Sequence, residues 1–268
     1  MAASDRSNTG WQRDLSVSYI KIGDVLVRQR KFDEALKCYR ESLAILERLG
    51  TSDRSSTGWQ RDLSVSYERI GEVREAQGKL DEALKGYQDT LTIRERLAAY
   101  DLSNAGWQYD LSVSYERFGD VLMKQDKPDQ ALKSYRRDGL AIRERLAASD
   151  RSNTGWQNDF QYSIGRMGKL AYRFILDRSF ASALEASDLV ISLAPDTILL
   201  RTKRAHALMF LDRVDEARAL YLRYRGEKYA QDGRTWETVV LEDFAQLREA
   251  GVTHPLMDEI KARFSAGG

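Results

Sequence analysis

The sequence predicts an all-α, right-handed superhelical solenoid built from antiparallel helix pairs. The first observation is a segment that is written three times with few changes, beginning at Thr9, Thr57 and Ala105, and that begins a fourth time at Thr154. The second is the spacing of four tryptophans, which lie at positions 11, 59, 107 and 156 and so keep one period of 48 or 49 residues. A fixed period of this length is the signature of a repeat array, in which each unit packs only against its neighbours.

Each unit should begin with a helix of about 20 residues, roughly 30 Å long. Thr9 and the glutamine three residues later match a capping box, which satisfies free backbone amides at a helix start. Leu15 and Ile22 then recur at helical spacing on one apolar face. The second and fourth copies keep the threonine, whereas Ala105 replaces it in the third copy. We therefore expect a weaker helix start at Ala105.

A second helix should complete each unit as a hairpin. It carries Ala35, Tyr39 and Leu43 on one face. The first helix contains Gly23, although glycine inside a helix costs about 1 kcal/mol relative to alanine. Because Ala35 is also small and recurs with the glycine in later copies, we expect the two to face each other where the helices cross most closely.

The third copy contains one residue more than the first two. Its second helix has four residues between Tyr135 and Leu140, where the first two copies have three. One added residue would rotate the following apolar face by about 100°, unless a π-bulge absorbs it. The spacing therefore predicts a local irregularity of the helix between Arg136 and Leu140.

The unit resembles a tetratricopeptide repeat, and the resemblance extends over residues 9–225. The ordinary repeat of the family has 34 residues. With its period of 48 residues, the unit is similar to the longer repeats of kinesin light chain and of bacterial signalling proteins. The resemblance implies that the first helices of successive repeats line a concave groove for an extended peptide or a partner helix. It rests on residues at fixed spacing in the two helices: Tyr19, Ile22 and Gly23 in the first, and Ala35, Tyr39 and Leu43 in the second.

We expect two parts in the chain, a repeat array of about five helical hairpins over residues 1–225 and capping helices over residues 226–268. The segment AASDRSNTGW that links repeats at residues 147–156 also begins at residue 2. A chain that starts in a linker suggests either a missing upstream part or an uncovered first hairpin.

An uncovered first hairpin would have a visible consequence. Val17 and Leu36 should then be less buried than their counterparts Val65 and Leu84. Exposed apolar surface of this kind favours self-association through the first repeat.

Composition excludes several classes of function. With 42 basic and 41 acidic residues the net charge is +1, which argues against a general binder of nucleic acid or of anionic membranes. The chain has no apolar run of about 18 residues and no signal peptide, so we expect a cytoplasmic protein. Its single cysteine, Cys38, can form no internal disulfide.

The sequence also lacks catalytic and cofactor motifs. We find no phosphate-binding loop, HExxH or CxxC, so we expect neither an enzyme nor a bound metal or cofactor. His206 lies mid-helix, where a solvated or hydrogen-bonded side chain is expected rather than a catalytic base. Two repeated columns, one of aspartates (14, 62, 110 and 159) and one of arginines (48, 96 and 145), are expected to form salt-bridge ladders between repeats.

The candidate binding residues lie on the first helices, on the side that the family uses for its groove. We expect an acidic groove over repeats one to three and a basic, aromatic surface at repeat four. A bound peptide would then place its basic part near repeats two and three and its acidic part near repeat four. The acidic candidates are Asp24, Glu68, Glu72, Glu75, Glu116 and Asp120, and those of repeat four are Tyr162, Arg166, Lys169, Tyr172 and Arg173.

These observations favour a non-catalytic scaffold that binds a peptide or a helix of a partner protein. The alternative is a sensor or regulatory repeat module of a larger bacterial signalling protein. The resemblance does not identify the ligand, because one fold supports many functions.

Overall fold

The computed structural model describes residues 8–53, 55–195, 197–228 and 233–266. Over these residues the chain is an all-α solenoid without a β-sheet, apart from one isolated bridge between Lys228 and Thr235. The predicted fold class is therefore confirmed. The helices are α1 (Thr9–Arg28), α2 (Phe32–Ser52), α3 (Thr57–Ala76), α4 (Leu80–Tyr100), α5 (Ala105–Lys124), α6 (Pro128–Ser134), the π-helix η1 (Tyr135–Leu140), α7 (Ala141–Ser149), α8 (Thr154–Leu176), α9 (Phe180–Leu193), α10 (Leu199–Phe210), α11 (Val214–Arg223), α12 (Trp236–Glu249) and α13 (Leu256–Ser265).

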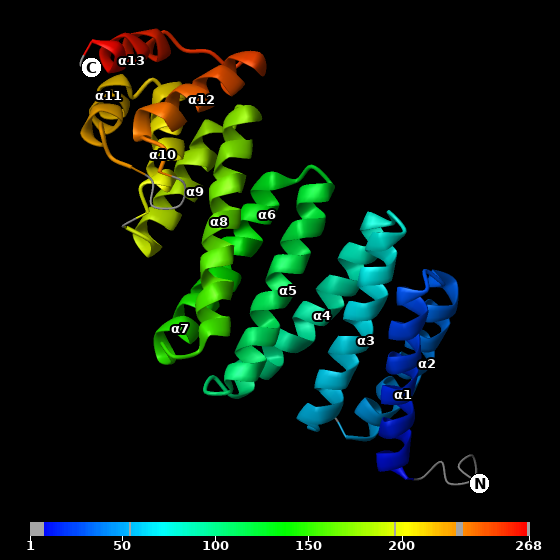
Figure 1. Cartoon of the computed structure of the whole chain (residues 1–268). Coiled ribbons are helices and arrows are strands. Elements are labelled where there is room, and N and C mark those ends of the chain that lie inside the picture. The colour runs from blue at the N-terminus through cyan, green and yellow to red at the C-terminus, as the bar shows by residue number, and fades with distance from the viewer. Residues whose placement is uncertain (1–7, 54, 196, 229–232, 267–268) are drawn as a thin grey trace. The chain divides into compact units, whose positions relative to one another are not determined.

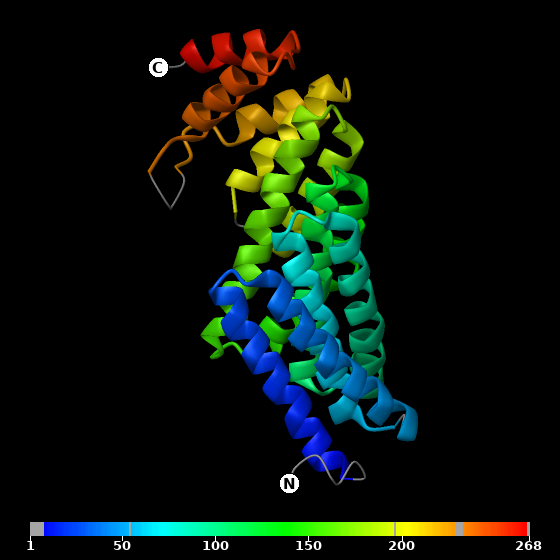
Figure 2. The ribbon, with the colours of Figure 1, turned by 90° about the vertical axis from the view of Figure 1, so that its right-hand side faces the viewer.

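The chain divides into two compact units, Met1–Ser149 and Asp150–Gly268. In the first unit, α1 with α2, α3 with α4, and α5 with α6 and α7 form three antiparallel hairpins (Figure 1). We call these repeats 1, 2 and 3. Successive hairpins pack side by side through α2 with α3 and α4 with α5, as Figure 2 also shows.

The second unit holds two further hairpins and two terminal helices. α8 pairs with α9, and α10 pairs with α11. Trp236 at the start of α12 is fully buried, and its indole N–H donates to the backbone oxygen of Tyr221 at 2.8 Å. We call the hairpin of α8 and α9 repeat 4. Whether residues 226–268 act as a cap, separate from the array, stays a prediction.

Helix starts differ from the expected capping box by one residue. The side chain of Asn8 accepts a hydrogen bond from the backbone N–H of Trp11 at 3.1 Å, so Asn8 is the N-cap and Thr9 is the first helical residue. Asn104 caps α5 in the same way at 3.1 Å. The expected weakness at Ala105 is therefore wrong, because the capping group precedes the position at which alanine replaces threonine.

The glycines of the first helices in repeats 1 to 3 lie against tyrosine rings, and Gly168 of repeat 4 lies against the side chain of Leu200. A Cβ placed on Gly119 would lie 2.5 Å from the ring of Tyr135, and one on Gly71 would lie 3.1 Å from the ring of Tyr87. Ala35 and its counterparts are fully buried, as expected, but the close approach admits an aromatic ring. The expected contact of small residue against small residue is found in repeat 2, where a Cβ on Gly71 would also lie 3.4 Å from the Ala83 carbonyl oxygen, but the nearest neighbours of Gly23 and Gly119 are tyrosine rings.

The extra residue of repeat 3 is absorbed within its second helix. Residues Tyr135–Leu140 form a π-helix between two α-helical segments. A π turn holds one residue more than an α turn, so the apolar face resumes in register with buried Leu140, Ile142 and Leu146. The irregularity predicted between Arg136 and Leu140 is confirmed.

The expected difference in burial between Val17 and Leu36 and their counterparts in repeat 2 is not found. Leu36 is 3% exposed, and its counterpart Leu84 is half-buried, so the prediction that Leu36 would be the less covered is wrong. Val17 and Val65 are both half-buried. Leu36 is covered by a cluster that joins Ile20 and Tyr39 of repeat 1 to Val73 of α3. The uncovered apolar surface of repeat 1 lies instead on α1, at Trp11, Leu15, Ile22 and Val25.

Candidate functional site

Contacts between successive repeats recur with the period of the sequence. Arg13 pairs with Asp62 at 2.6 Å, and Arg61 pairs with Asp110 at 3.0 Å. The aspartate column therefore forms the expected ladder at these two junctions. The expected arginine column does not, because the Nε groups of Arg48 and Arg96 donate to carbonyls of their own helices.

Two further ladders join the second helix of one repeat to the first helix of the next. The Tyr67 hydroxyl donates to Glu47 at 3.0 Å, and Tyr115 donates to Glu95 in the same way. The amide of Gln77 donates to Asp33 at 3.2 Å, and that of Gln125 donates to Asp81 at 2.8 Å. These contacts specify the register of stacking, because each polar group meets a fixed partner.

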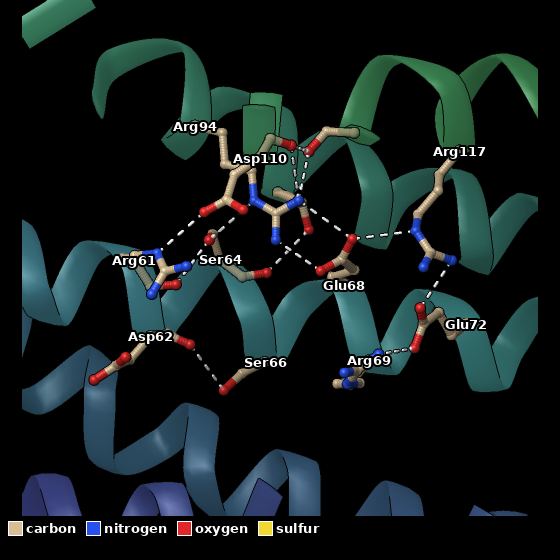
Figure 3. A network of polar contacts seen from close by, with 12 residues as sticks. Arg61, Asp62, Ser64, Ser66, Glu68, Arg69, Glu72, Arg94, Asp110 and Arg117 are labelled. Atoms are coloured by element: carbon tan, nitrogen blue, oxygen red, sulfur yellow. Dashed lines mark hydrogen bonds and ion pairs between the residues drawn. The ribbon is translucent and has the colours of Figure 1, made fainter. Parts of the chain in front are cut away.

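Repeat 2 contains a buried ion pair between its two helices. The guanidinium of Arg94 donates to both carboxylate oxygens of Glu68, at 3.2 and 2.7 Å (Figure 3). It also donates to the Ser114 hydroxyl at 2.8 Å and to the Asp110 carbonyl at 3.1 Å, both on α5. Arg94 therefore ties repeat 2 together and fastens it to repeat 3.

The two positions of this pair change together along the chain. Where one is charged the other is charged, and where one is apolar the other is small or apolar. In repeat 3 the pair is again ionic, at 2.7 Å. Repeat by repeat, the two positions hold Ile20 and Leu46, Glu68 and Arg94, Glu116 and Arg143, and Gly165 and Ala194.

The acidic candidates of the first unit are held by nearby cations and tyrosines. Asp24 accepts from the Tyr39 hydroxyl at 2.8 Å and lies 3.2 Å from Arg69. Glu72 pairs with Arg69 at 2.6 Å and with Arg117 at 2.8 Å, which Figure 3 shows. The expected row of acids is thus a network of paired charges.

The remaining acids follow the same rule. Glu75 accepts from the Tyr87 hydroxyl at 2.7 Å and pairs with Lys124 at 2.7 Å. Asp120 accepts from the Tyr135 hydroxyl at 2.6 Å. Burial and these hydrogen bonds raise the pKa of Tyr39 and Tyr87 well above the ordinary value, so both hydroxyls stay protonated donors.

The second unit contains a cavity of about 520 Å³ beside α8. It is open beside Gly165, the position that Ile20, Glu68 and Glu116 occupy in the earlier repeats, and a Cβ on Gly165 would meet no atom within 4 Å. Two of the residues expected from the sequence, Lys169 and Tyr172, belong to its lining. The complete lining comes from α8, α10 and α12 and the turn before α10: Gln161, Ile164, Gly165, Gly168, Lys169, Tyr172, Thr197, Leu200, Lys203, Asp243 and Gln246.

One wall of the cavity is a polar chain that continues into the core. The Lys203 ammonium donates to Asp243 at 2.7 Å and lies 4.3 Å from the centre of the Tyr172 ring. The second contact of Asp243 is His206 Nε2 at 3.0 Å, and His206 Nδ1 lies 2.7 Å from the Tyr221 hydroxyl. Lys203 and Asp243 reach the cavity, whereas His206 and Tyr221 lie wholly behind it.

Burial and hydrogen bonding set the protonation states of His206, Asp243 and Tyr221 in this polar network. Burial lowers the pKa of His206, so this imidazole is neutral at neutral pH and its two nitrogens need one donor and one acceptor. Burial alone would raise the pKa of Asp243, but the hydrogen bonds from His206 and Lys203 and the positive charge of Lys203 outweigh it and lower that pKa. His206 Nε2–H therefore donates to the carboxylate, and Nδ1 accepts from the Tyr221 hydroxyl, whose pKa is raised by burial.

The other expected residues of repeat four lie along α8 outside the cavity lining. Tyr162 is exposed, and the Arg166 guanidinium lies 5.7 Å from the centre of its ring. Arg173 pairs with Asp177 at 3.3 Å, near the end of the helix. The Tyr172 hydroxyl donates to Gln246 at 3.1 Å, which ties α8 to α12.

Sequence reasoning missed Lys203, Asp243 and Gln246. Lys203 lies in the fifth hairpin, whose sequence departs from the first three repeats, and Asp243 and Gln246 lie in the segment expected to form a cap, so no candidate residues were assigned there. His206 was expected to be solvated or hydrogen-bonded, and it is hydrogen-bonded and buried. The sequence did contain one signal for a polar cluster here. His206 follows Lys203 by three residues on a predicted helix, and residues at this spacing share one helix face.

Within the described residues, no helix is long and apolar enough to cross a membrane. Over the same residues, no group of three or more histidine, cysteine, aspartate and glutamate side chains could hold a metal ion.

Comparisons with known proteins agree with this architecture. A family model described as the tetratricopeptide repeat matches residues 16–49. A crystal structure of BtubC (BKLC) from P. vanneervenii is similar over 82% of this chain and 82% of its own, with a TM-score of 0.50 and 14% identity. At that identity the similarity shows the fold alone. No curated protein matches the sequence.

Two further solved structures are less similar. A putative kinesin light chain of Podosopora anserina with nearly identical TPR-like repeats covers 77% of this chain and 91% of its own, with a TM-score of 0.46 and 14% identity. YrrB, described as a TPR protein with an unusual peptide-binding site, covers 83% and 91%, with a TM-score of 0.39 and 14% identity.

Proposed function

We propose that this chain, a tetratricopeptide-repeat protein, is a non-catalytic scaffold that binds a peptide or a helix of a partner protein. The observation that carries the proposal is the cavity beside α8, which joins an apolar floor to basic and aromatic groups. Its volume of about 520 Å³ lies within the range of small-ligand pockets, roughly 300–1,000 Å³. That is room for one or two side chains of a peptide.

The lining indicates the chemistry of the bound segment. Ile164 and Leu200, with the bare backbone of Gly165, offer apolar contact to an inserted side chain. The charge of Lys203 is matched by Asp243, so the exposed ammonium of Lys169 provides the positive charge at the rim. An apolar or aromatic anchor with an adjacent acidic residue fits this arrangement, because Tyr162 and Arg166 extend the same basic, aromatic surface along α8.

The acids of the first unit make a smaller contribution in this proposal. The side chains of Glu68 and Glu116 are only 10% and 14% exposed, and each is committed to a buried arginine. Asp24 and Glu72 are 28% and 24% exposed and can reach a ligand only in competition with Arg69. We therefore assign specificity mainly to the surface of repeat four.

The decisive experiment is selection from a random peptide library on the intact chain, with a variant whose cavity is filled as the comparison. Gly165→Leu places a side chain in open space and also removes a glycine from a helix, so it should fold while closing the cavity. Gly50→Leu makes the same change in a helix of the other unit, where a Cβ also meets no atom within 4 Å.

We expect enriched peptides to share an apolar or aromatic residue next to Asp or Glu. They should lose at least about tenfold in affinity on Gly165→Leu, a difference of about 1.4 kcal/mol. Lys169→Glu should weaken binding, and Gly50→Leu should not. Peptides that bind the Gly165→Leu variant as well as the natural chain would place recognition elsewhere and overturn the proposal.

A further inference from the structure

The outer face of α1 carries a continuous stripe of large apolar side chains. Trp11, Leu15, Ile22 and Val25 lie at helical spacing and are between 48% and 56% exposed. Scattered exposed apolar residues are ordinary on protein surfaces, but a contiguous stripe along one helix marks an interaction surface.

The chain itself shows what covers this stripe in the next repeat. Trp59 and Leu63 are the counterparts of Trp11 and Leu15, and they pack against Ile45, Leu46 and Leu49 of α2. Ile70 and Val73, the counterparts of Ile22 and Val25, belong to the cluster of α2 residues Ala35, Leu36 and Tyr39. The covering element is therefore the second helix of a preceding hairpin.

In the third repeat, the equivalent face is also covered by the second helix of the preceding hairpin. Phe118 and Val121 occupy the positions of Ile22 and Val25, and they pack with Ala83, Leu84 and Tyr87 of the preceding hairpin. Val121 is fully buried, whereas Val25 is about half exposed. Two separate junctions thus cover this face with the same helix of the same repeat type.

Polar side chains beside the stripe carry the same information. Asp14, Tyr19 and Gln29 occupy the positions of Asp62, Tyr67 and Gln77, which accept from Arg13, donate to Glu47 and donate to Asp33. In repeat 1, none of these three side chains has a hydrogen-bond partner within the described part of the chain. The face therefore lacks one arginine, one glutamate and one aspartate at known positions.

We propose that the outer face of α1 is a docking surface for a partner that presents a helical hairpin of this same repeat type. The partner's second helix would cover Trp11, Leu15, Ile22 and Val25. An arginine on the partner's first helix, at the position of Arg13, would meet Asp14. A glutamate and an aspartate on its second helix, at the positions of Glu47 and Asp33, would meet Tyr19 and Gln29. This surface is separate from the cavity of the second unit and does not depend on it.

The test presents such a hairpin to α1 within one polypeptide. A second copy of residues 9–56 is placed directly before Thr9 of the full chain, and amide hydrogen exchange is followed in α1. Exchange should slow by about tenfold or more when the stripe is covered, because local opening then exposes more apolar surface. The matched control carries Arg13→Ala, Asp33→Ala and Glu47→Ala in the added copy only, and it should recover part of the faster exchange.

Two further measurements keep the outcome clear. Ile22→Asp with Val25→Asp on α1 should abolish the protection, while circular dichroism confirms that the helices remain. Unchanged exchange in α1, or equal protection by the control hairpin, would overturn the proposal. If light scattering shows that the unextended chain forms a dimer that these two substitutions dissociate, the occupant is a second copy of this chain and the proposal of a separate partner protein is wrong.

Discussion

The ring of Tyr39 lies against the backbone of Gly23, so close that a Cβ on this glycine would be 2.4 Å from the tyrosine Cε1. The ring is almost completely buried, and its hydroxyl donates to Asp24 at 2.8 Å on the next residue of α1. The ring therefore packs directly on α1, and a methyl group added at Gly23 would force the buried ring or the helix to shift.

We expect Gly23→Ala to destabilise the first unit by about 1–3 kcal/mol, the usual cost of overpacking a core. This cost should exceed the roughly 1 kcal/mol that alanine contributes to helix propensity. Gly50→Ala, at a helical glycine with no atom within 4 Å of a Cβ, should stabilise instead. Urea unfolding of both variants measures the difference, and a stabilising Gly23→Ala would refute the packing argument.

The buried pair of Arg94 and Glu68 should reveal itself in a double-mutant cycle. Arg94→Leu alone leaves a buried carboxylate without its main partner and should cost about 3–5 kcal/mol. Adding Glu68→Ile converts the site to the apolar pair of repeat 1 and should recover most of that loss. Thermal unfolding provides the measurement. A double variant that is as unstable as the single one would contradict this reading.

The π-helix of repeat 3 can be tested by deletion. Removing Asp138 restores the spacing of repeats 1 and 2 and places Gly139 at the position of Ser42 and Thr90. We expect a continuous α-helix, because the extra residue is the reason for the π turn. The thermal midpoint should be unchanged or higher. A lower midpoint, or loss of helical circular dichroism, would mean that the third repeat requires the π turn.

Acid should destabilise the second unit through the buried chain of His206 and Asp243. The folded pKa of His206 is lowered by burial, so below about pH 6.5 the unfolded chain binds a proton that the folded chain does not. The free energy of unfolding should then fall by up to about 1.4 kcal/mol per pH unit. The pKa of Asp243 is also lowered, which adds a second loss as the pH falls below about 4.

Denaturant unfolding at several pH values measures both steps. His206→Gln keeps a donor and an acceptor but does not titrate, so it should flatten the slope between about pH 5 and 7. The slope of the natural chain and that of the variant should agree again above about pH 7. An unchanged slope in the variant would assign the acid sensitivity to other groups.

Much of the fold could be read from the sequence because it is repeated. The period predicted the hairpins, and the one extra residue before Leu140 predicted the π-helix. Contacts between a small and a large side chain were harder to predict from the sequence. The pairing of Gly23 with Tyr39 was missed, because the spacing of small residues alone suggested Ala35 as its neighbour.

Some residues of the candidate site could also be predicted from the sequence, and others could not. Lys169 and Tyr172 could be placed because α8 continues the register of the earlier first helices. Lys203 and Asp243 could not, since α10 departs in sequence from the earlier first helices, α12 lies outside the array, and both meet α8 only through tertiary packing. The paired state of the acids in the first unit also required the structure, because helical periodicity says nothing of how an arginine such as Arg117 reaches across to a neighbouring repeat.

The alternation between ionic and apolar pairs has a consequence for how the chain finds its hairpins. Near-identical helices could join in the wrong combination while the chain folds, a known failure of repeat proteins. If α1 joined α4, Ile20 would meet Arg94 and bury an unpaired cation. If α3 joined α2, Glu68 would face Leu46 and bury an unpaired anion. Either error costs several kcal/mol, about 3–5 for one broken buried pair, so the pair keeps the helices of repeat 1 from joining those of repeat 2, whereas repeats 2 and 3 share the same ionic pair and are not separated by it.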